Sequence, residues 1–134
     1  MEIIWKEKYR IGVDVIDEQH KEFIEILGEL LVACEGPRVE EDIKKLIERL
    51  QDYANKHFAF EERYMREFGY EEVENHTKEH FLFKQRIQDI KEKYEKGDHI
   101  LQYDIFDLMQ SWLKDHVTGE DKKFASCFRE HGLQ

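Results

Sequence analysis

Apolar side chains recur at steps of three and four residues along most of this chain, which is the spacing of one face of an α-helix. No segment of useful length alternates between apolar and polar residues with period two, so no strand is predicted. The four apolar stripes cover residues 17–34, 43–68, 73–94 and 101–116, and they are followed by Gly36, Gly69, Gly97 and Gly119. Because glycine commonly ends helices, the sequence predicts four helices with these boundaries.

The connections near residues 35–38, 68–71 and 96–100 are short, and short connections make consecutive helices antiparallel neighbours. The predicted fold is therefore all-α, an up-down-up-down antiparallel four-helix bundle. The first sixteen residues and the tail from Phe124 onward carry apolar residues that could pack across the bundle. We expect an N-terminal extended arm and a short C-terminal helix there. A chain of 134 residues has the size of a single domain, 1–134, with one sizeable core.

Composition and charge narrow the classes of function. Hydrophobic residues make up 40% of the chain and charged residues 39%, as in a soluble protein with a packed interior. The formal net charge is −10, from 31 acidic and 21 basic side chains, so nucleic acid is not an expected partner. An acidic surface also disfavours self-association weakly, and we expect a monomer.

Nothing in the sequence predicts attachment to a membrane or export. No apolar run is long enough to cross a bilayer, and the first residues lack the pattern of a secretory signal. The two cysteines, Cys34 and Cys127, do not have metal-binding spacing. A disulfide between them is one interpretation, but two free thiols in a reducing cytoplasm are preferred. We therefore expect a cytoplasmic protein.

Five of the seven histidines fall on the apolar stripes. A single histidine in a core is more often a hydrogen-bonded structural residue than a ligand, so their joint arrangement decides the question. His57 and Glu61 are four residues apart, as are His76 and His80, and each pair therefore projects from one helix face in neighbouring turns.

The same residues lie at matching depths in an antiparallel bundle. Glu61 lies eight residues before Gly69, and His76 lies seven residues after it. His80 lies 17 residues before Gly97, and His116 lies 19 residues after it. His20 lies 16 residues before Gly36, and His57 lies 21 residues after it. At about 1.5 Å per residue, these separations bring residues from all four helices to one level, toward the end of the bundle that carries the second connection.

Asp121 needs a separate argument. It lies five residues after His116, which corresponds to about 140° around a regular helix and would turn its side chain away from that face. We expect Gly119 to relax the helix and let Asp121 turn inward. The alternative is a solvated helix end, which is the better interpretation of this stretch taken alone.

Five imidazoles and two carboxylates inside an apolar bundle would be costly without a cation. A single zinc ion would use about four ligands and leave the others without a role. Two octahedral metal ions, bridged by both carboxylates and by one oxide or hydroxide, would use every ligand and leave one open position for a small molecule. Imidazole and carboxylate ligands suit iron without excluding manganese, cobalt or zinc. The Glu-x-x-His motif of di-iron oxidases is absent, which favours binding of dioxygen over its activation.

Four segments of this chain resemble the hemerythrin family, as it occurs in bacteria, and the resemblance covers essentially the whole chain. The segments are Asp17-Glu18-Gln19-His20, His57-Phe58-Ala59-Phe60-Glu61-Glu62, His76-Thr77-Lys78-Glu79-His80 and His116-Val117-Thr118-Gly119-Glu120-Asp121. One departure is Glu71, where relatives often have proline, but it lies in a connection and affects no ligand.

The resemblance implies a site with two non-haem iron ions bridged by oxide or hydroxide. His76, His80 and His116 would bind one ion and His20 and His57 the other. Glu61 and Asp121 would bridge them, and dioxygen would occupy the open position on the two-histidine iron. Positions that line the family's oxygen pocket hold Phe23, Phe58, Trp112, Leu113 and Val117 here, although plain core packing also accounts for them. His99 and His131 fall outside the signature, and we expect both on the surface.

The function expected first is reversible dioxygen binding for storage, delivery or sensing, with an oxygen-using enzyme or a signalling protein as a conceivable partner, and without catalysis. A di-iron enzyme or stress protein that consumes peroxide or nitric oxide is the alternative. Iron storage is a third interpretation and predicts more than two metal ions per chain, but the sequence offers no second cluster of ligands.

Overall fold

Helices account for most of the chain in a computed structural model, which describes residues 5–37, 39–97 and 101–133. Within helices, the side chains of residues 39–40, 101–103 and 117–122 are not described. Across these ranges no strand occurs. The order of elements is the 3-10 helix η1 (Glu7–Tyr9), α1 (Asp14–Cys34), α2 (Val39–Glu67), α3 (Val73–Glu95), α4 (Leu101–Trp112), the π-helix η2 (Leu113–Glu120) and α5 (Asp121–Glu130).

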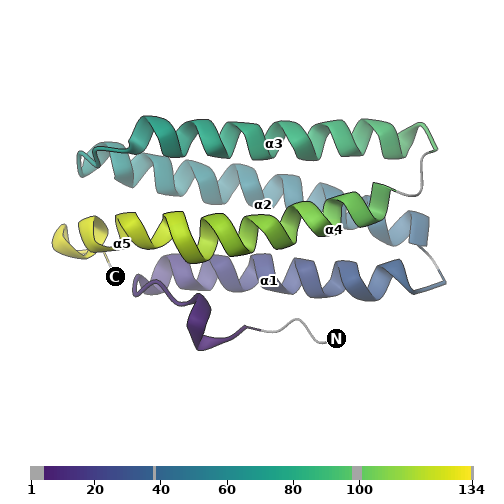
Figure 1. Ribbon diagram of the computed structural model, residues 1–134, viewed down its shortest axis with the longest axis horizontal. Coiled ribbons are helices and arrows are strands. Elements are labelled where there is room, and N and C mark those ends of the chain that lie inside the picture. The colour runs from purple at the N-terminus through teal and green to yellow at the C-terminus, as the bar shows by residue number, and fades with distance from the viewer. Residues whose placement is uncertain (1–4, 38, 98–100, 134) are drawn as a thin grey trace.

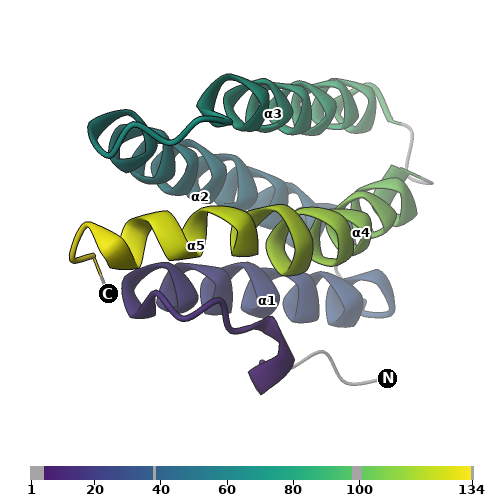
Figure 2. The same ribbon diagram turned by 60° about the vertical axis from the view of Figure 1, so that its left-hand side comes forward.

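The helices form an antiparallel bundle in which α1 packs against α2 and α4, and α3 packs against the same two helices (Figures 1 and 2). Each predicted stripe forms a helix, and the boundaries agree within a few residues for the first three. The all-α bundle predicted from the sequence is confirmed.

The turn between α2 and α3 fixes how these two helices face each other. Gly69 has φ +67°, a left-handed conformation that glycine adopts without steric cost. The amide of Tyr70 donates to the carbonyl oxygen of Met65 at 2.9 Å, and the amide of Gly69 donates to that of Arg66 at 3.3 Å. These are the two hydrogen bonds of a Schellman motif, which satisfies the last carbonyls of α2.

The fourth helix differs from the prediction. It does not end near Gly119: the chain stays helical from α4 through η2 into α5, and the three elements follow one another along one side of the bundle (Figure 1). In η2 the hydrogen bonds run from residue i to i+5. The break expected at Gly119 was wrong, and a widened helix takes its place.

Buried apolar residues form two clusters along the bundle. The larger, which we call the main core, fills the half toward the α1–α2 connection and includes Leu30, Ile47 and Ile87. The smaller, which we call the end core, contains Ile11, Val13, Ile16, Met65, Phe124, Ala125 and Phe128. Fully burying one such side chain contributes roughly 1.5–3 kcal/mol.

The N-terminal arm and α5 close the end of the bundle, as the apolar residues in both segments predicted, although η1 interrupts the extended course of the arm. The buried carboxylate of Asp17 accepts hydrogen bonds from the amides of Ile11 (2.8 Å) and Gly12 (3.2 Å). Arg129 of α5 donates to the carbonyl oxygen of Ile11 at 2.9 Å. These bonds hold the arm across the start of α1. Asp17, which accepts two of them, lies three residues before His20.

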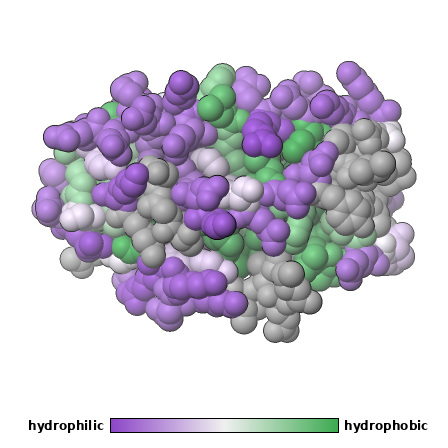
Figure 3. All heavy atoms as spheres, viewed as in Figure 1, coloured by the Kyte–Doolittle hydropathy of each residue, from purple (hydrophilic) through white to green (hydrophobic). Residues whose placement is uncertain are grey.

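Cys34 and Cys127 are both free thiols, as predicted, and burial raises the pKa of each above its ordinary value. In the described part of the chain, no helix combines the length and the apolar character that a membrane span requires. The face seen in Figure 3 is mostly hydrophilic, with apolar patches between the charged side chains.

Candidate metal centre

Six of the seven predicted metal ligands meet inside the bundle, between the main core and the end core. They are His20 on α1, His57 and Glu61 on α2, His76 and His80 on α3, and His116 on η2. Each is at most 4% exposed. The depth matching predicted from the sequence is confirmed, because residues from four separate helical segments reach one level.

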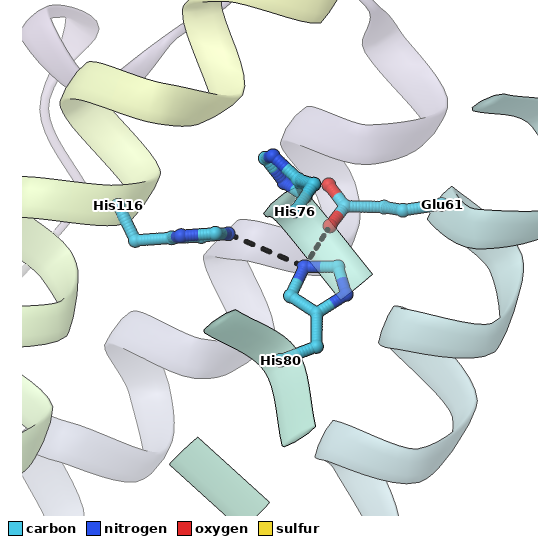
Figure 4. A group of neighbouring side chains, drawn as sticks. All are labelled: Glu61, His76, His80 and His116. Atoms are coloured by element: carbon cyan, nitrogen blue, oxygen red, sulfur yellow. Dashed lines mark hydrogen bonds and ion pairs between the residues drawn. The ribbon is translucent and has the colours of Figure 1, made fainter. Parts of the chain in front are cut away.

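Three histidines surround one side of Glu61. His76 and His80 lie one turn apart on α3, and His116 reaches them from η2 (Figure 4). Nε2 of His80 lies 3.3 Å from Nε2 of His116 and 3.2 Å from Oε1 of Glu61. Each of the four residues offers a ligand atom within 4.8 Å of the others. We call Glu61, His76, His80 and His116 the three-histidine group.

Glu61 belongs to a second set of ligand atoms as well. Its Oε1 lies 3.4 Å from Nε2 of His57, and its Oε2 lies 4.0 Å from Nε2 of His20. The ligand atoms of His20, His57 and Glu61 again all lie within 4.8 Å of one another. We call these three residues the two-histidine group. The carboxylate of Glu61 therefore lies between histidines of α1, α2 and α3.

The outward-facing nitrogens of three histidines contact polar side chains. Nδ1 of His57 lies 2.6 Å from Oε1 of Gln19, and Nδ1 of His116 lies 3.0 Å from Oε2 of Glu79. Nδ1 of His80 faces Oε2 of Glu62 at 3.6 Å. Burial raises the pKa of the Glu62 carboxyl group, but the nearby polar groups of His80 and Thr77 and the charges of His80 and Lys84 outweigh that effect and leave the pKa below its ordinary value.

These contacts make the interior of the group suited to a cation. A neutral imidazole that donates from Nδ1 to a carboxylate carries its lone pair on Nε2. The Nε2 atom of His116, whose Nδ1 contacts Glu79, then directs its lone pair at Nε2 of His80, 3.3 Å away beside the carboxylate of Glu61. Ligand atoms that converge on one point in this way suit a metal ion. The donor set therefore fits a metal centre.

The side chains of Asp121 and Val117 lie outside the described residues. The backbone nevertheless bears on Asp121, which is the first residue of α5 and follows η2 directly. In a π-helix the hydrogen bonds join residues five apart, so each turn is wider than in an α-helix, and Asp121 is five residues after His116. The angle of 140° calculated for a regular helix therefore does not apply along η2.

The predicted oxygen-pocket residues Phe23, Phe58 and Leu113 are buried, and Trp112 is half-buried. Phe58 stacks on the ring of His80, with centroids 3.9 Å apart, and Trp112 stacks on His116 at 3.7 Å. Phe23 packs against Tyr53, which stacks on His57 at 5.2 Å. Aromatic carbon thus covers both histidine groups on the side of the main core.

Sequence reasoning missed the side chains that contact the outer nitrogens, namely Gln19, Glu62 and Glu79. A signal was present, since each is the immediate neighbour in sequence of a predicted ligand. Of the two remaining histidines, His131 is exposed and stacks on Phe68 at 4.6 Å, so its predicted surface position is confirmed. His99 lies outside the described residues.

Comparison with known proteins agrees with this arrangement. The family described as "Hemerythrin HHE cation binding domain" matches residues 11–128. A bacteriohemerythrin of Stenotrophomonas maltophilia is 32% identical over 129 residues, which cover 96% of this chain and 83% of that protein. A bacteriohemerythrin of Clostridium acetobutylicum is 30% identical over 126 residues, which cover 90% of this chain and 97% of that protein. On this evidence the chain belongs to the hemerythrin family.

Proposed function

We propose that this protein is a non-haem di-iron protein that binds dioxygen reversibly. The observation that carries the proposal is the position of Glu61, whose carboxylate belongs to both sets of histidine ligand atoms. Its Oε1 lies 3.2 Å from Nε2 of His80 and 3.4 Å from Nε2 of His57, and its Oε2 lies 4.0 Å from Nε2 of His20. A carboxylate shared in this way is what a pair of bridged metal ions requires, and a single ion would not use it.

The proposed ligands divide between the two groups. The three-histidine group would hold one iron ion, the two-histidine group would hold the other, and Glu61 would bridge them. Asp121 is proposed as the second bridging carboxylate. With fewer histidines, the two-histidine group leaves a coordination position for a small molecule, and dioxygen is proposed to bind on that side.

Two ferrous ions would supply the electrons that dioxygen needs in order to bind reversibly. The residues of the chain orient the histidine rings and exclude water from the site. Glu79 and Gln19 hold the rings of His116 and His57 so that Nε2 points inward. Phe58 and Trp112 cover the rings of His80 and His116 with carbon, and Phe23 and Leu113 are proposed to line the pocket with them. An apolar lining keeps out water and protons, which would otherwise promote irreversible oxidation.

The test is to load the protein with ferrous iron under anaerobic conditions, admit air, and then remove the oxygen while recording the visible spectrum. We expect about two iron ions per chain and an absorption band that appears with oxygen and disappears without it.

Prompt irreversible oxidation would contradict reversible binding, and catalytic consumption of added peroxide or nitric oxide would favour an enzyme instead. A metal content near one ion per chain would contradict the two-metal site. Many more than two ions per chain would indicate storage.

We propose oxygen storage, delivery or sensing as the biological role. The protein would act as a single domain, because the arm and α5 pack on the bundle through the end core. A cytoplasmic location is proposed because Cys34 and Cys127 are both free, which suits a reducing compartment.

A further inference from the structure

Gln19 and Glu79 occupy equivalent positions on two different helices. Gln19 immediately precedes His20 on α1, and Glu79 immediately precedes His80 on α3. Each reaches a histidine of another helical segment: Oε1 of Gln19 lies 2.6 Å from Nδ1 of His57, and Oε2 of Glu79 lies 3.0 Å from Nδ1 of His116. One residue before an inward-facing histidine, a side chain points about 100° around the helix and so faces its neighbour.

The two equivalent residues differ in charge. The three-histidine group has an anionic partner for His116 in Glu79, and His80 faces a second carboxylate, Glu62, at 3.6 Å. The partner of His57 is a neutral amide. A carboxylate that accepts from Nδ1 draws the proton away from the ring and makes Nε2 a stronger donor to a metal, whereas an amide oxygen orients the ring with a smaller effect on its basicity.

Both partners stand beside solvent. A surface hollow of about 350 Å³ between α1 and α2 is lined by Gln19, Tyr53 and His57 among others. Another, of about 290 Å³, includes Glu79, Trp112 and His116 in its lining. Water could therefore reach Nδ1 of either histidine if its partner were shortened, so the two polar side chains also decide what contacts the outer face of each ring.

We propose that Gln19 is a positioning residue for the two-histidine metal ion. It fixes His57 with the proton on Nδ1 and the lone pair of Nε2 directed at Glu61. Because Gln19 is neutral, the ion held by His57 has a weaker set of donors than the ion held beside Glu79. The inference rests on the proposed di-metal function.

The experiment uses cobalt(II) as the probe, titrated into the full-length metal-free protein in competition with a chelator. Gln19→Leu keeps most of the volume but offers no acceptor, and we expect the affinity for one of the two cobalt ions to fall roughly 10–100-fold. Gln19→Glu restores an acceptor and adds charge, and it should bind that ion at least as tightly as the wild type. Gln19→Ala should lie between them, because water can enter. Gln85→Leu, at an exposed position on α3, is the matched control and should leave both affinities unchanged.

A second measurement does not depend on affinity. In the zinc-loaded wild type, the Nδ1 proton of His57 should be visible by NMR and slow to exchange with solvent. In Gln19→Leu that proton should exchange roughly tenfold faster, because it has lost its hydrogen-bond acceptor. With iron bound, Gln19→Glu should lower the reduction potential of the centre, and Glu79→Gln should raise it.

A purely structural role for Gln19 predicts equal losses in Gln19→Leu and Gln19→Glu, and that result would overturn the proposal. Unchanged cobalt affinity in Gln19→Leu would overturn it as well. If the wild type itself binds fewer than two cobalt ions, the proposed function fails and this inference fails with it. Two ions in the wild type with no difference among the variants would overturn this inference alone.

Discussion

The three-histidine and two-histidine groups are built from the same two kinds of side chain, yet their surroundings differ. In the three-histidine group, Phe58 and Trp112 stack directly on the rings of His80 and His116, at 3.9 and 3.7 Å. In the two-histidine group, the ring of His57 stacks on Tyr53 at a wider 5.2 Å.

The residues that contact the outer nitrogens also differ between the groups. The carboxylate of Glu79 lies beside His116, whereas the neutral amide of Gln19 lies beside His57. Ligand identity alone would make the two proposed iron ions differ only by one histidine. The neighbours add a difference in donor strength and in coverage by carbon, which are the properties that tune a metal ion. If the proposed function holds, the two similar sets of ligands acquire separate roles through residues that bind no metal.

The largest effect is expected from removing Glu61, the residue that both groups share. Glu61→Ala should reduce iron from about two ions per chain to nearly none, because each group loses a ligand and metal binding is coupled to folding. The wild type should gain about 2.7 kcal/mol of unfolding free energy for each bound ion at a metal concentration near 100 times Kd, and the variant should gain none. Elemental analysis and thermal unfolding with and without iron measure the iron content and the gain in stability.

Glu67→Ala, exposed on the same helix, is the control for Glu61→Ala and should keep two iron ions. Two retained iron ions in Glu61→Ala would contradict the shared-ligand site.

Breaking one group at a time should separate the two metal ions. His116→Ala and His20→Ala should each lower the metal content to about one ion per chain, since each leaves the other histidine group intact. His20→Ala should also abolish the oxygen-dependent absorption band. Metal content and the visible spectrum after exposure to air provide the measurement. His131→Ala, outside both groups, should keep two ions, and loss of both ions in either single variant would show that the groups are not separable.

The aromatic cover can be removed without touching a ligand. Phe58 is 1% exposed and stacks on His80, so Phe58→Ala should lower the unfolding free energy by about 3–5 kcal/mol. It should also speed irreversible oxidation, because water reaches the three-histidine group. Urea unfolding and the decay of the oxygen-dependent band measure the two effects. Phe81→Ala is the matched control on the surface, where the side chain is 54% exposed, and its cost should stay within about 0.5 kcal/mol.

The smallest expected effect tests the turn that aligns α2 with α3. Gly69→Ala forces an alanine to φ +67° and should cost about 1–2 kcal/mol. Gly97→Ala imposes similar strain at φ +98°, at the end of α3 away from the metal centre. We expect comparable losses of stability by urea unfolding, but weaker cobalt binding to the three-histidine group only in Gly69→Ala. Equal cobalt affinities in the two variants would indicate that the turn does not set the alignment of Glu61 with His76 and His80.

Much of the fold and of the candidate site followed from the sequence. Stripes of apolar residues predicted α1, α2 and α3 closely because burial of one face dictates helical spacing. The separations of Glu61 and His76 from Gly69 predicted that they would meet, since the rise per residue is constant in a regular helix. The prediction failed only toward the end of the fourth helix, where η2 has a wider turn; counting from Gly97 still placed His116 at the level of the site.

The sequence by itself determined the all-α bundle, the level of the site and the chemistry of its ligands, because these depend on spacing and residue type within single helices. Only the tertiary structure decided that the fourth helix widens at η2 instead of stopping at Gly119, and that Gln19 and Glu79 contact His57 and His116. These features depend on which side chains of separate helices come within hydrogen-bonding distance, and the rotation of each helix about its own axis is set by packing of the whole core.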